Sequence, residues 1–496
     1  MRKGYLTVYL SLSLGIILSL ILALTEWARV NAMRMQIECV ADTAASSVLA
    51  EYHRQLLEQY ELFFVDTSYG TNMAVYANTE AHLKDYMEHN FSLKGLTTIQ
   101  NYRDILKLST GNVSIRAATV ATDENGIGIK RQAVLYEKDK IGLSLIEDVM
   151  NNLQTVTEYE EESGNIEEQR QNVEEELNEL IRQTEENMPP ETEIIETENG
   201  LEEIEVKPKI TRDNPADLVN ATRGFSILEL VVRDRNAISY QRITPSNYVT
   251  GRQLHAGNGR QEGVAYPDSL VENILFHEYV LDKCSRYTGV LDKSLLKYQV
   301  EYIVAGKDSD EENLKSIINR LLLIREAANV IYLLSDSSRM AEIETVSTVL
   351  SLVCMVPEAE PFVRYSILFA WAYVESIQDV RDLLDQKRVP LVKSSGTWKT
   401  KLLNMTEYQQ HWSQGGNEGE GLSYDDYLRI FLCMTNEDTV TMRLADIMEM
   451  DIRQTSGNEN FRMDACIDSF EFIAQVTSRY GYDFSIQRKY SYMVGN

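Results

Sequence analysis

The chain has 496 residues, of which 44% are apolar and 25% charged, and this composition excludes a wholly disordered protein. Its length allows roughly two or three domains of about 100 to 200 residues each. The formal net charge of −28 argues against a nucleic-acid partner, because Lys and Arg side chains carry the binding of phosphate backbones.

The first predicted element is a membrane span over residues 5–24. This stretch contains no charged side chain, and it follows directly on Arg2, Lys3 and Gly4. About 20 apolar residues of helix cross the hydrocarbon core of a bilayer, so the stretch is long enough to span one. It exceeds the apolar run of a cleavable signal peptide, which favours a retained anchor. The basic residues before it predict a single-pass protein of the cell membrane with a cytoplasmic N-terminus and an extracytoplasmic bulk.

An amphipathic stalk helix is predicted to continue from the span without a break. No Pro or Gly occurs in residues 24–64, and apolar residues recur there at steps of three and four. Such spacing draws one stripe along a helix. The stripe consists of Val30, Met33, Ile37, Val40, Ala44, Val48, Tyr52 and Leu56. It is expected to pack against other anchored subunits, with packing against the protein's own domain as the alternative.

The N-terminal segment resembles that of TadE- and TadG-like proteins of bacterial tight-adherence (Flp, type IVb) pilus systems. The resemblance rests on a basic residue and Gly4 before the apolar run, and on the A-D-T-A-A stretch from Ala41 to Ala45. It implies a pilin-like or pseudopilin-like helix, partners among pilus subunits, and a processing site between Gly4 and Tyr5.

The likeness extends along the chain. Residues 51–66, 313–336 and 370–384 are similar to segments of an uncharacterised family of bacterial membrane-anchored proteins found with such pilus genes. One position departs from the pilin pattern, in which a Glu lies five residues after the cleaved Gly and neutralises a neighbouring subunit's amine. That position is Tyr9 here, and because Tyr supplies no carboxylate, we predict an uncleaved anchor rather than a standard fibre subunit.

The middle of the chain is strongly acidic. Residues 158–206 hold nineteen Glu against two Arg. The apolar spacing of the first half predicts a helix that ends at Pro189 and Pro190. We expect a projecting solvated helix or a flexible linker rather than a calcium site, because calcium needs carboxylates at set positions of a folded loop.

The other predicted elements are mostly helices. Helices are expected over residues 80–90, 266–286, 313–334, 340–355, 361–384, 423–434 and 438–452. Strands are expected over residues 113–122 and 296–304, and residues 467–476 and 484–494 are expected to form an antiparallel hairpin. Residues 244–263 and 414–421 are predicted loops.

The predicted fold class is therefore α+β. It comprises a transmembrane helix that continues into an amphipathic stalk, followed by a mainly helical domain with antiparallel strands. The predicted segments are 1–24 (tip and span), 25–66 (stalk), 67–157 (small mixed region), 158–210 (acidic segment) and 211–496 (extracytoplasmic domain).

No catalytic, cofactor-binding or metal-binding residues are predicted. The phosphate loop and the zinc-helix motif H-E-x-x-H are missing from the sequence. The five cysteines contain no C-x-x-C pair, and buried free thiols are favoured over a disulfide. His277 is expected on a helix face. Charges within apolar helices are interpreted as paired polar groups of a bundle rather than a binding cleft; they are Arg325, Glu326, Glu375, Asp379, Arg381 and Asp382.

The leading hypothesis is a non-enzymatic, single-pass component of a tight-adherence pilus or related secretion apparatus, with a minor pseudopilin-like or assembly role. The alternative is a tethered surface adhesin or binding module. A membrane-tethered hydrolase ranks third.

Overall fold

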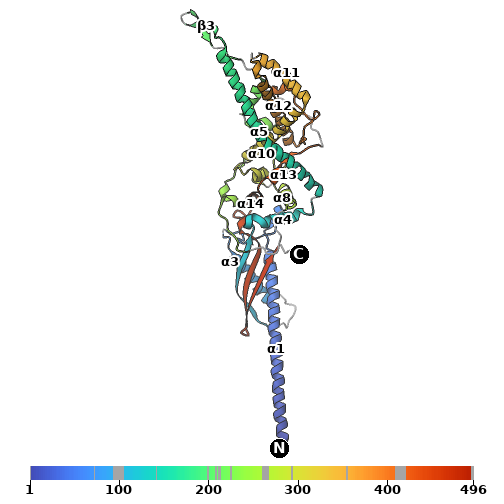
Figure 1. Cartoon of the computed structure of the whole chain (residues 1–496). Coiled ribbons are helices and arrows are strands. Elements are labelled where there is room, and N and C mark those ends of the chain that lie inside the picture. Colours follow the sequence, from blue (N-terminus) through green and yellow to red (C-terminus); the bar gives the residue numbers. More distant parts are fainter. Residues whose placement is uncertain are drawn as a thin grey trace. The chain divides into compact units, whose positions relative to one another are not determined.

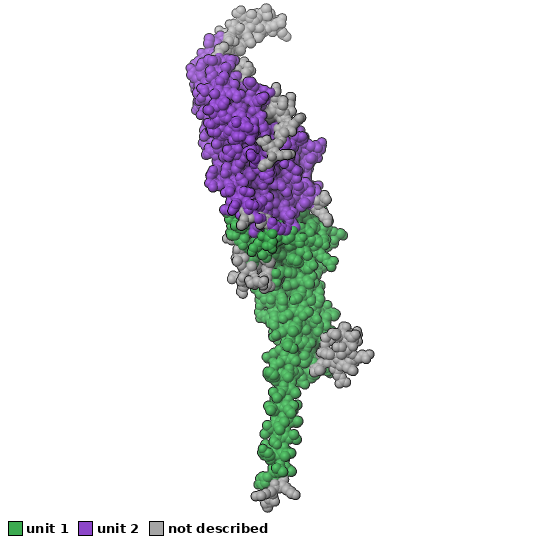
Figure 2. Space-filling view, turned by 90° about the vertical axis from the view of Figure 1, so that its right-hand side faces the viewer, with its two compact units in different colours: residues 1–139, 245–272, 441–496 green, residues 140–244, 273–440 purple. Residues whose placement is uncertain are grey.

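A computed structural model describes residues 2–71, 73–92, 106–140, 142–197, 200–206, 209–210, 214–223, 226–259, 267, 269–291, 294–353, 356–407 and 420–492. These residues form two compact units, each assembled from segments far apart in the sequence (Figure 2). Unit 1 contains residues 1–139, 245–272 and 441–496, and unit 2 contains residues 140–244 and 273–440.

Unit 1 contains an antiparallel sheet with β5 at its centre. Its elements are α1 (Arg2–Leu49), α2 (Arg54–Tyr60), β1 (Val65–Asp66), α3 (Tyr76–Phe91), β2 (Leu108–Val120), α4 (Ile127–Glu137), most of α14 (Glu437–Arg453), β5 (Cys466–Ser478) and β6 (Asp483–Ser491). β5 pairs antiparallel with β1, β2 and β6. The predicted hairpin is thus confirmed as β5 and β6, with Phe470 opposite Tyr490.

The core of unit 1 lies between this sheet and two helices. The C-terminal half of α1 contacts β6, α3 contacts β2, and the two helices contact each other (Figure 1). Successive side chains of a strand point to opposite faces, and β6 follows this rule: Phe484 and Ile486 pack inward while Ser485 and Gln487 are exposed. The sheet therefore buries one apolar face beneath α1 and α3.

The prediction of one unbroken helix to residue 64 is wrong. α1 ends at Leu49, and the separate helix α2 begins at Arg54. The imidazole Nδ1 of His53 accepts a hydrogen bond from the Leu56 backbone N–H at 3.3 Å and so caps α2. The Glu51 carboxylate accepts hydrogen bonds from side chains outside α1, including the Tyr86 hydroxyl at 2.7 Å. A side-chain cap and a contact with a later helix thus accompany the helix break, which needs no Pro or Gly.

Unit 2 is mainly helical. Its elements are α5 (Leu143–Asn187), β3 (Glu191–Thr197), β4 (Gly200–Val206), α6 (Pro215–Thr222), α7 (Ile227–Val231), most of α8 (Leu270–Lys283), α9 (Gln299–Ala305), α10 (Asp310–Ser335), α11 (Ser337–Val353), α12 (Glu360–Leu384) and α13 (Tyr424–Met434). α10 packs against α5, α11 and α12. The helices predicted over 313–334, 340–355 and 361–384 correspond to α10, α11 and α12, although residues 354–355 lie outside the described residues.

The strand predicted over residues 296–304 is wrong, because the structure has the short helix α9 there. The alternation of apolar and polar residues had indicated a half-buried strand. Two of the polar members, Gln299 and Glu301, are instead fully buried. The Glu301 carboxylate accepts hydrogen bonds from the Tyr424 hydroxyl at 2.8 Å and from the Tyr287 backbone N–H at 2.9 Å. Partners distant in the sequence thus make burial of the Glu301 carboxylate tolerable.

The first half of the acidic segment forms a helix that ends where the sequence predicted. α5 ends at Asn187, just before Pro189, and β3 and β4 follow as an antiparallel hairpin. α5 is less solvated than predicted, because Val156, Ile166 and Leu177 are buried on the side facing unit 2's other helices. Apolar side chains at helical spacing therefore outweigh the many Glu residues in positioning this helix.

Candidate functional site

The predicted packing stripe belongs to the protein's own core. Its five members from Met33 to Val48 are at most 6% exposed, and the last four of them belong to the core that α1 shares with the sheet and α3, while Val30 and Tyr52 are half-buried. Leu56 is also buried, but on α2. Of the two roles open to the stripe, the structure therefore supports packing against its own domain. A contact of α1 with other subunits would have to use residues closer to the N-terminus.

The processing position lies in the exposed part of α1. Gly4 and Tyr5 are both exposed, and the Tyr9 side chain is 72% exposed. α1 is long and apolar enough to cross a membrane, and none of its most apolar stretch is buried against other residues. Both observations agree with an N-terminal anchor.

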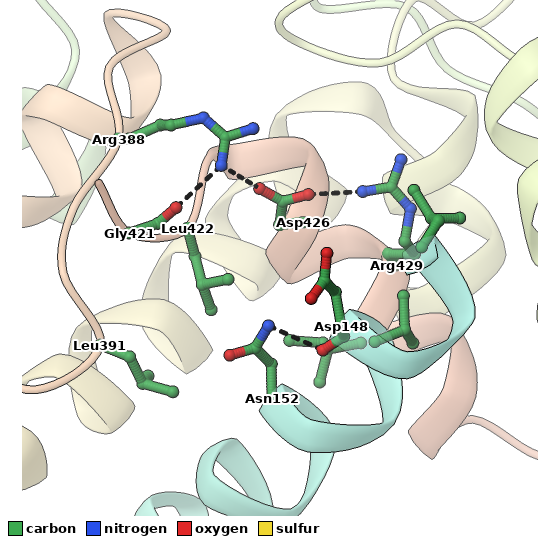
Figure 3. A pocket seen from close by; sticks show the side chains of 11 residues that line it. Asp148, Asn152, Arg388, Leu391, Gly421, Leu422, Asp426 and Arg429 are labelled. Atoms are coloured by element: carbon green, nitrogen blue, oxygen red, sulfur yellow. Dashed lines mark hydrogen bonds and ion pairs between the residues drawn. The ribbon is translucent and has the colours of Figure 1, made fainter. Parts of the chain in front are cut away.

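A pocket of about 390 Å³ is the candidate functional site, and it lies entirely within unit 2. Two helices and two loop segments line it. They contribute Leu145, Asp148, Val149 and Asn152 from α5; Arg388, Leu391, Gly421 and Leu422 from two loop segments; and Asp426, Arg429 and Ile430 from α13. The α5 residues share one helix face, because they are spaced by three and four. Figure 3 shows them opposite the loop that carries Arg388.

The loop wall of the pocket is held by paired backbone groups. Val389 and Leu422 form an antiparallel bridge with two N–H···O=C bonds of 2.9 Å. Gly421 adopts a φ of +102°, and a Cβ there would come within 2.3 Å of the Val389 backbone. This close approach requires glycine.

Replacing Gly421 with Ala should open this wall. We expect Gly421→Ala to lower the free energy of unfolding by at least about 1–3 kcal/mol, because it combines an unfavourable backbone conformation with a backbone clash. Gly396→Ala is the matched control, since the nearest atom to its new Cβ would be 4.0 Å away. Denaturant unfolding of both variants measures the difference. Equal stability of the two variants would contradict the close packing at Gly421.

A network of buried charged side chains contacts the same loop wall through the backbone of Leu391. Arg325 donates from Nη1 to the Leu391 carbonyl at 3.2 Å and from Nη2 to Asp379 at 2.9 Å. Lys393 Nζ lies 2.6 Å from both Asp379 and Glu375, and all four charged side chains are fully buried. The positive charges of Lys393 and Arg325 outweigh the effect of burial and lower the pKa of Asp379 to about 2. These charges are thus paired within a helix bundle, as predicted.

Asp426 organises the charged side of the pocket between two arginines. Its carboxylate accepts from Arg388 Nη1 at 3.2 Å and from Arg429 Nη1 at 2.5 Å (Figure 3). It also forms a capping box with Ser423 at the start of α13, which confirms the predicted helix start there. Arg429 makes a second ion pair with Glu278. Arg429 is thus paired twice, whereas the Arg388 side chain is 47% exposed.

Cys433, His277 and Glu437 form a second cluster. His277 Nδ1 lies 3.3 Å from the Cys433 sulfur, and Nε2 lies 3.0 Å from a Glu437 oxygen. His277 lies on the helix α8, as predicted, and its side chain is fully buried. Burial, together with nearby carboxylates, raises the pKa of Cys433 to about 12, which keeps the thiol protonated near neutral pH. The cluster therefore has the residue types of a nucleophilic site without an activated thiol.

The remaining cysteines are free where the structure describes them. Cys284 and Cys466 are buried free thiols, as predicted, Cys39 is exposed, and Cys354 lies outside the described residues. Most of the predicted loop 414–421 also lies outside them. Within the described part of the chain, no three His, Cys, Asp or Glu side chains converge as metal ligands would.

Comparison with known families gives one finding. Residues 205–478 match the model of a Family of unknown function (DUF5702), and this range is more than half of the chain. The chain belongs to the DUF5702 family. The DUF5702 match includes the loop segments and α13 of the pocket, but neither its α5 wall nor α1. Comparison with curated proteins and with solved structures finds no match.

The pocket was not predicted from the sequence, and only part of it left a signal there. Leu145, Val149 and Asn152 have helical spacing, and Ser423 with Asp426 forms a recognisable capping pair. Nothing local to Arg388 indicates its approach to Asp426, 38 residues later. That approach follows from the pairing of Val389 with Leu422, which only the folded chain establishes.

Proposed function

We propose that the protein is a single-pass, membrane-anchored component of a tight-adherence pilus or related secretion apparatus, with a minor pseudopilin-like or assembly role and no catalytic activity. One observation carries this proposal: α1 is divided between two environments. Residues 5–24 are apolar and nearly all exposed, whereas residues from Met33 to Val48 supply part of a folded core. A helix with this division suits a subunit anchored in the membrane and folded outside it, as the sequence resemblance implies.

The end of the exposed stretch has the chemistry of a membrane interface. The Tyr482 hydroxyl donates to Glu26 at 2.5 Å, and the Arg29 guanidinium lies 4.7 Å from the centre of the Tyr480 ring. Trp27 is 68% exposed, and Tyr480 is 44% exposed. Aromatic and charged side chains gather where a membrane helix leaves the hydrocarbon. These contacts support a lipid boundary near Glu26, with the turn between β5 and β6 beside it.

A tethered binding module is the second candidate, and the pocket in unit 2 favours it. The pocket has a loop wall held by backbone hydrogen bonds and an exposed charged side chain, Arg388, as a binding site would have. This candidate differs from the first in what the anchor does. An assembly component uses α1 for lateral contacts, while a binding module needs only attachment.

Exchange of the span separates the two candidates. Residues 5–24 are replaced by an unrelated membrane span of equal length, which leaves the buried stripe intact. The assembly role predicts that the chimaera stays in the membrane fraction but no longer co-purifies with pilus proteins. The variants Val40→Asp and Val48→Asp would not serve here, since both side chains are buried and the unit would be disrupted.

Two results would count against the assembly role. The first is a chimaera that keeps every partner of the unaltered protein. The second is an unaltered protein that co-purifies with no pilus protein at all. Either result favours the tethered module.

A further inference from the structure

The pocket in unit 2 contains one cationic side chain with unused hydrogen-bond donors and one carboxylate that forms no ion pair with the residues that the structure describes. Arg388 uses Nη1 for Gly421 and Asp426, and its Nε and Nη2 make no hydrogen bond to the residues that the structure describes. The Asp148 side chain is exposed and makes no hydrogen bond or ion pair within that part of the chain. The neighbouring carboxylates Asp426 and Glu278 are already paired with arginines. Arg388 and Asp148 are therefore available to a ligand.

Apolar side chains from two sides also line the pocket. Leu145 and Val149 come from the same helix face as Asp148, and Leu391 and Leu422 come from the bridged loop wall. Asn152 donates from its side chain to the Asp148 carbonyl at 2.8 Å, which leaves its amide oxygen as an acceptor (Figure 3). The volume of about 390 Å³ lies within the range of about 300–1,000 Å³ that is typical of ligand pockets.

We propose that this pocket binds a short peptide with an apolar side chain between two charged groups of opposite sign. A carboxylate of the peptide pairs with the free N–H groups of Arg388, and an amine pairs with Asp148. A guanidinium binds a carboxylate through two parallel N–H groups, so the pair has a preferred orientation as well as opposite charges. The apolar side chain lies against the leucines, and the Asn152 oxygen accepts a backbone N–H. This binding does not depend on the assembly role of α1.

The orientation is testable with one peptide and its capped forms. The tripeptide Ala-Leu-Ala, with both ends free, is titrated into the full-length protein in detergent and followed by calorimetry. We expect saturable binding that weakens about 5- to 10-fold when either the N-terminus is acetylated or the C-terminus is amidated, because each cap removes one charged contact. These arms use the unaltered protein, so they do not depend on the folding of a variant.

Variants link each end of the peptide to its residue. In Asp148→Asn, acetylation should no longer weaken binding, and in Arg388→Gln, amidation should no longer do so. The matched controls are Glu147→Gln and Arg235→Gln, which change exposed charges outside the pocket and should retain the full effect of both caps. The proposal is overturned by no saturable binding at millimolar peptide, by equal binding of capped and free forms, or by cap effects that persist in both pocket variants.

Discussion

Ala44→Asp should unfold unit 1 of the protein while leaving its membrane attachment intact. Ala44 is fully buried in the core that α1, α3 and the sheet share. An Asp carboxylate buried at this position loses its hydration and gains no hydrogen bond or ion pair in return. We expect the free energy of unfolding of unit 1 to fall by more than about 4 kcal/mol, a loss comparable to the whole stability of many domains.

Ser46→Asp is the matched control for this experiment. Ser46 lies two residues further along α1, and its side chain is exposed. The same charge there should change stability by less than about 0.5 kcal/mol. Limited proteolysis and thermal unfolding of both variants in detergent measure the difference. If Ala44→Asp were as stable as Ser46→Asp, the stripe would not be part of the core.

Asp379→Asn should have an effect of similar size in unit 2. The Asp379 carboxylate neutralises both Arg325 and Lys393, and all three side chains are fully buried. Removing its charge leaves two buried cations with too little countercharge. The expected loss is about 3–5 kcal/mol in the free energy of unfolding, measured by denaturant titration. Asp385→Asn provides the control, because that carboxylate pairs with a largely exposed Arg233 and should contribute at most about 1 kcal/mol.

The same carboxylate predicts how the stability of unit 2 depends on pH. The pKa of Asp379 is lowered to about 2 in the folded protein, below the unfolded value of about 3.9. Its contribution is therefore complete above about pH 4 and is lost as the pH falls towards about 2. Asp379→Asn should show a smaller loss of stability across that interval than the unaltered protein. An identical acid dependence in both would contradict this role for Asp379.

The sequence predicted features that depend on local periodicity. The span of residues 5–24 follows from a continuous apolar run, the stripe around Ala44 and the helices of unit 2 follow from apolar residues at helical spacing, and the structure contains all of these helices. The hairpin of β5 and β6 was also predicted, since it needs only a short turn at Gly481.

Features that depend on distant partners were predicted wrongly or not at all. The helix break after Leu49 involves Glu51 and hydrogen-bond donors from a later helix, and α9 buries Glu301, whose carboxylate accepts hydrogen bonds from Tyr287 and Tyr424. The pocket depends on the pairing of Val389 with Leu422. Contacts between residues far apart in the sequence leave little trace in the spacing of apolar and polar residues along the chain.

The native Cys39 offers the most direct test of the membrane-anchored arrangement. This thiol is exposed on α1, beyond the apolar stretch. Intact cells are treated with a membrane-impermeant maleimide, and the labelling that is lost in Cys39→Ser is assigned to Cys39. Leu18→Cys, made in the Cys39→Ser background, reports on the apolar stretch itself. We predict that Cys39 is labelled in intact cells and that the thiol at position 18 is not, even after permeabilisation. Labelling of Cys39 only in permeabilised cells, or equal labelling at both positions, would contradict an anchor with its folded units outside the membrane.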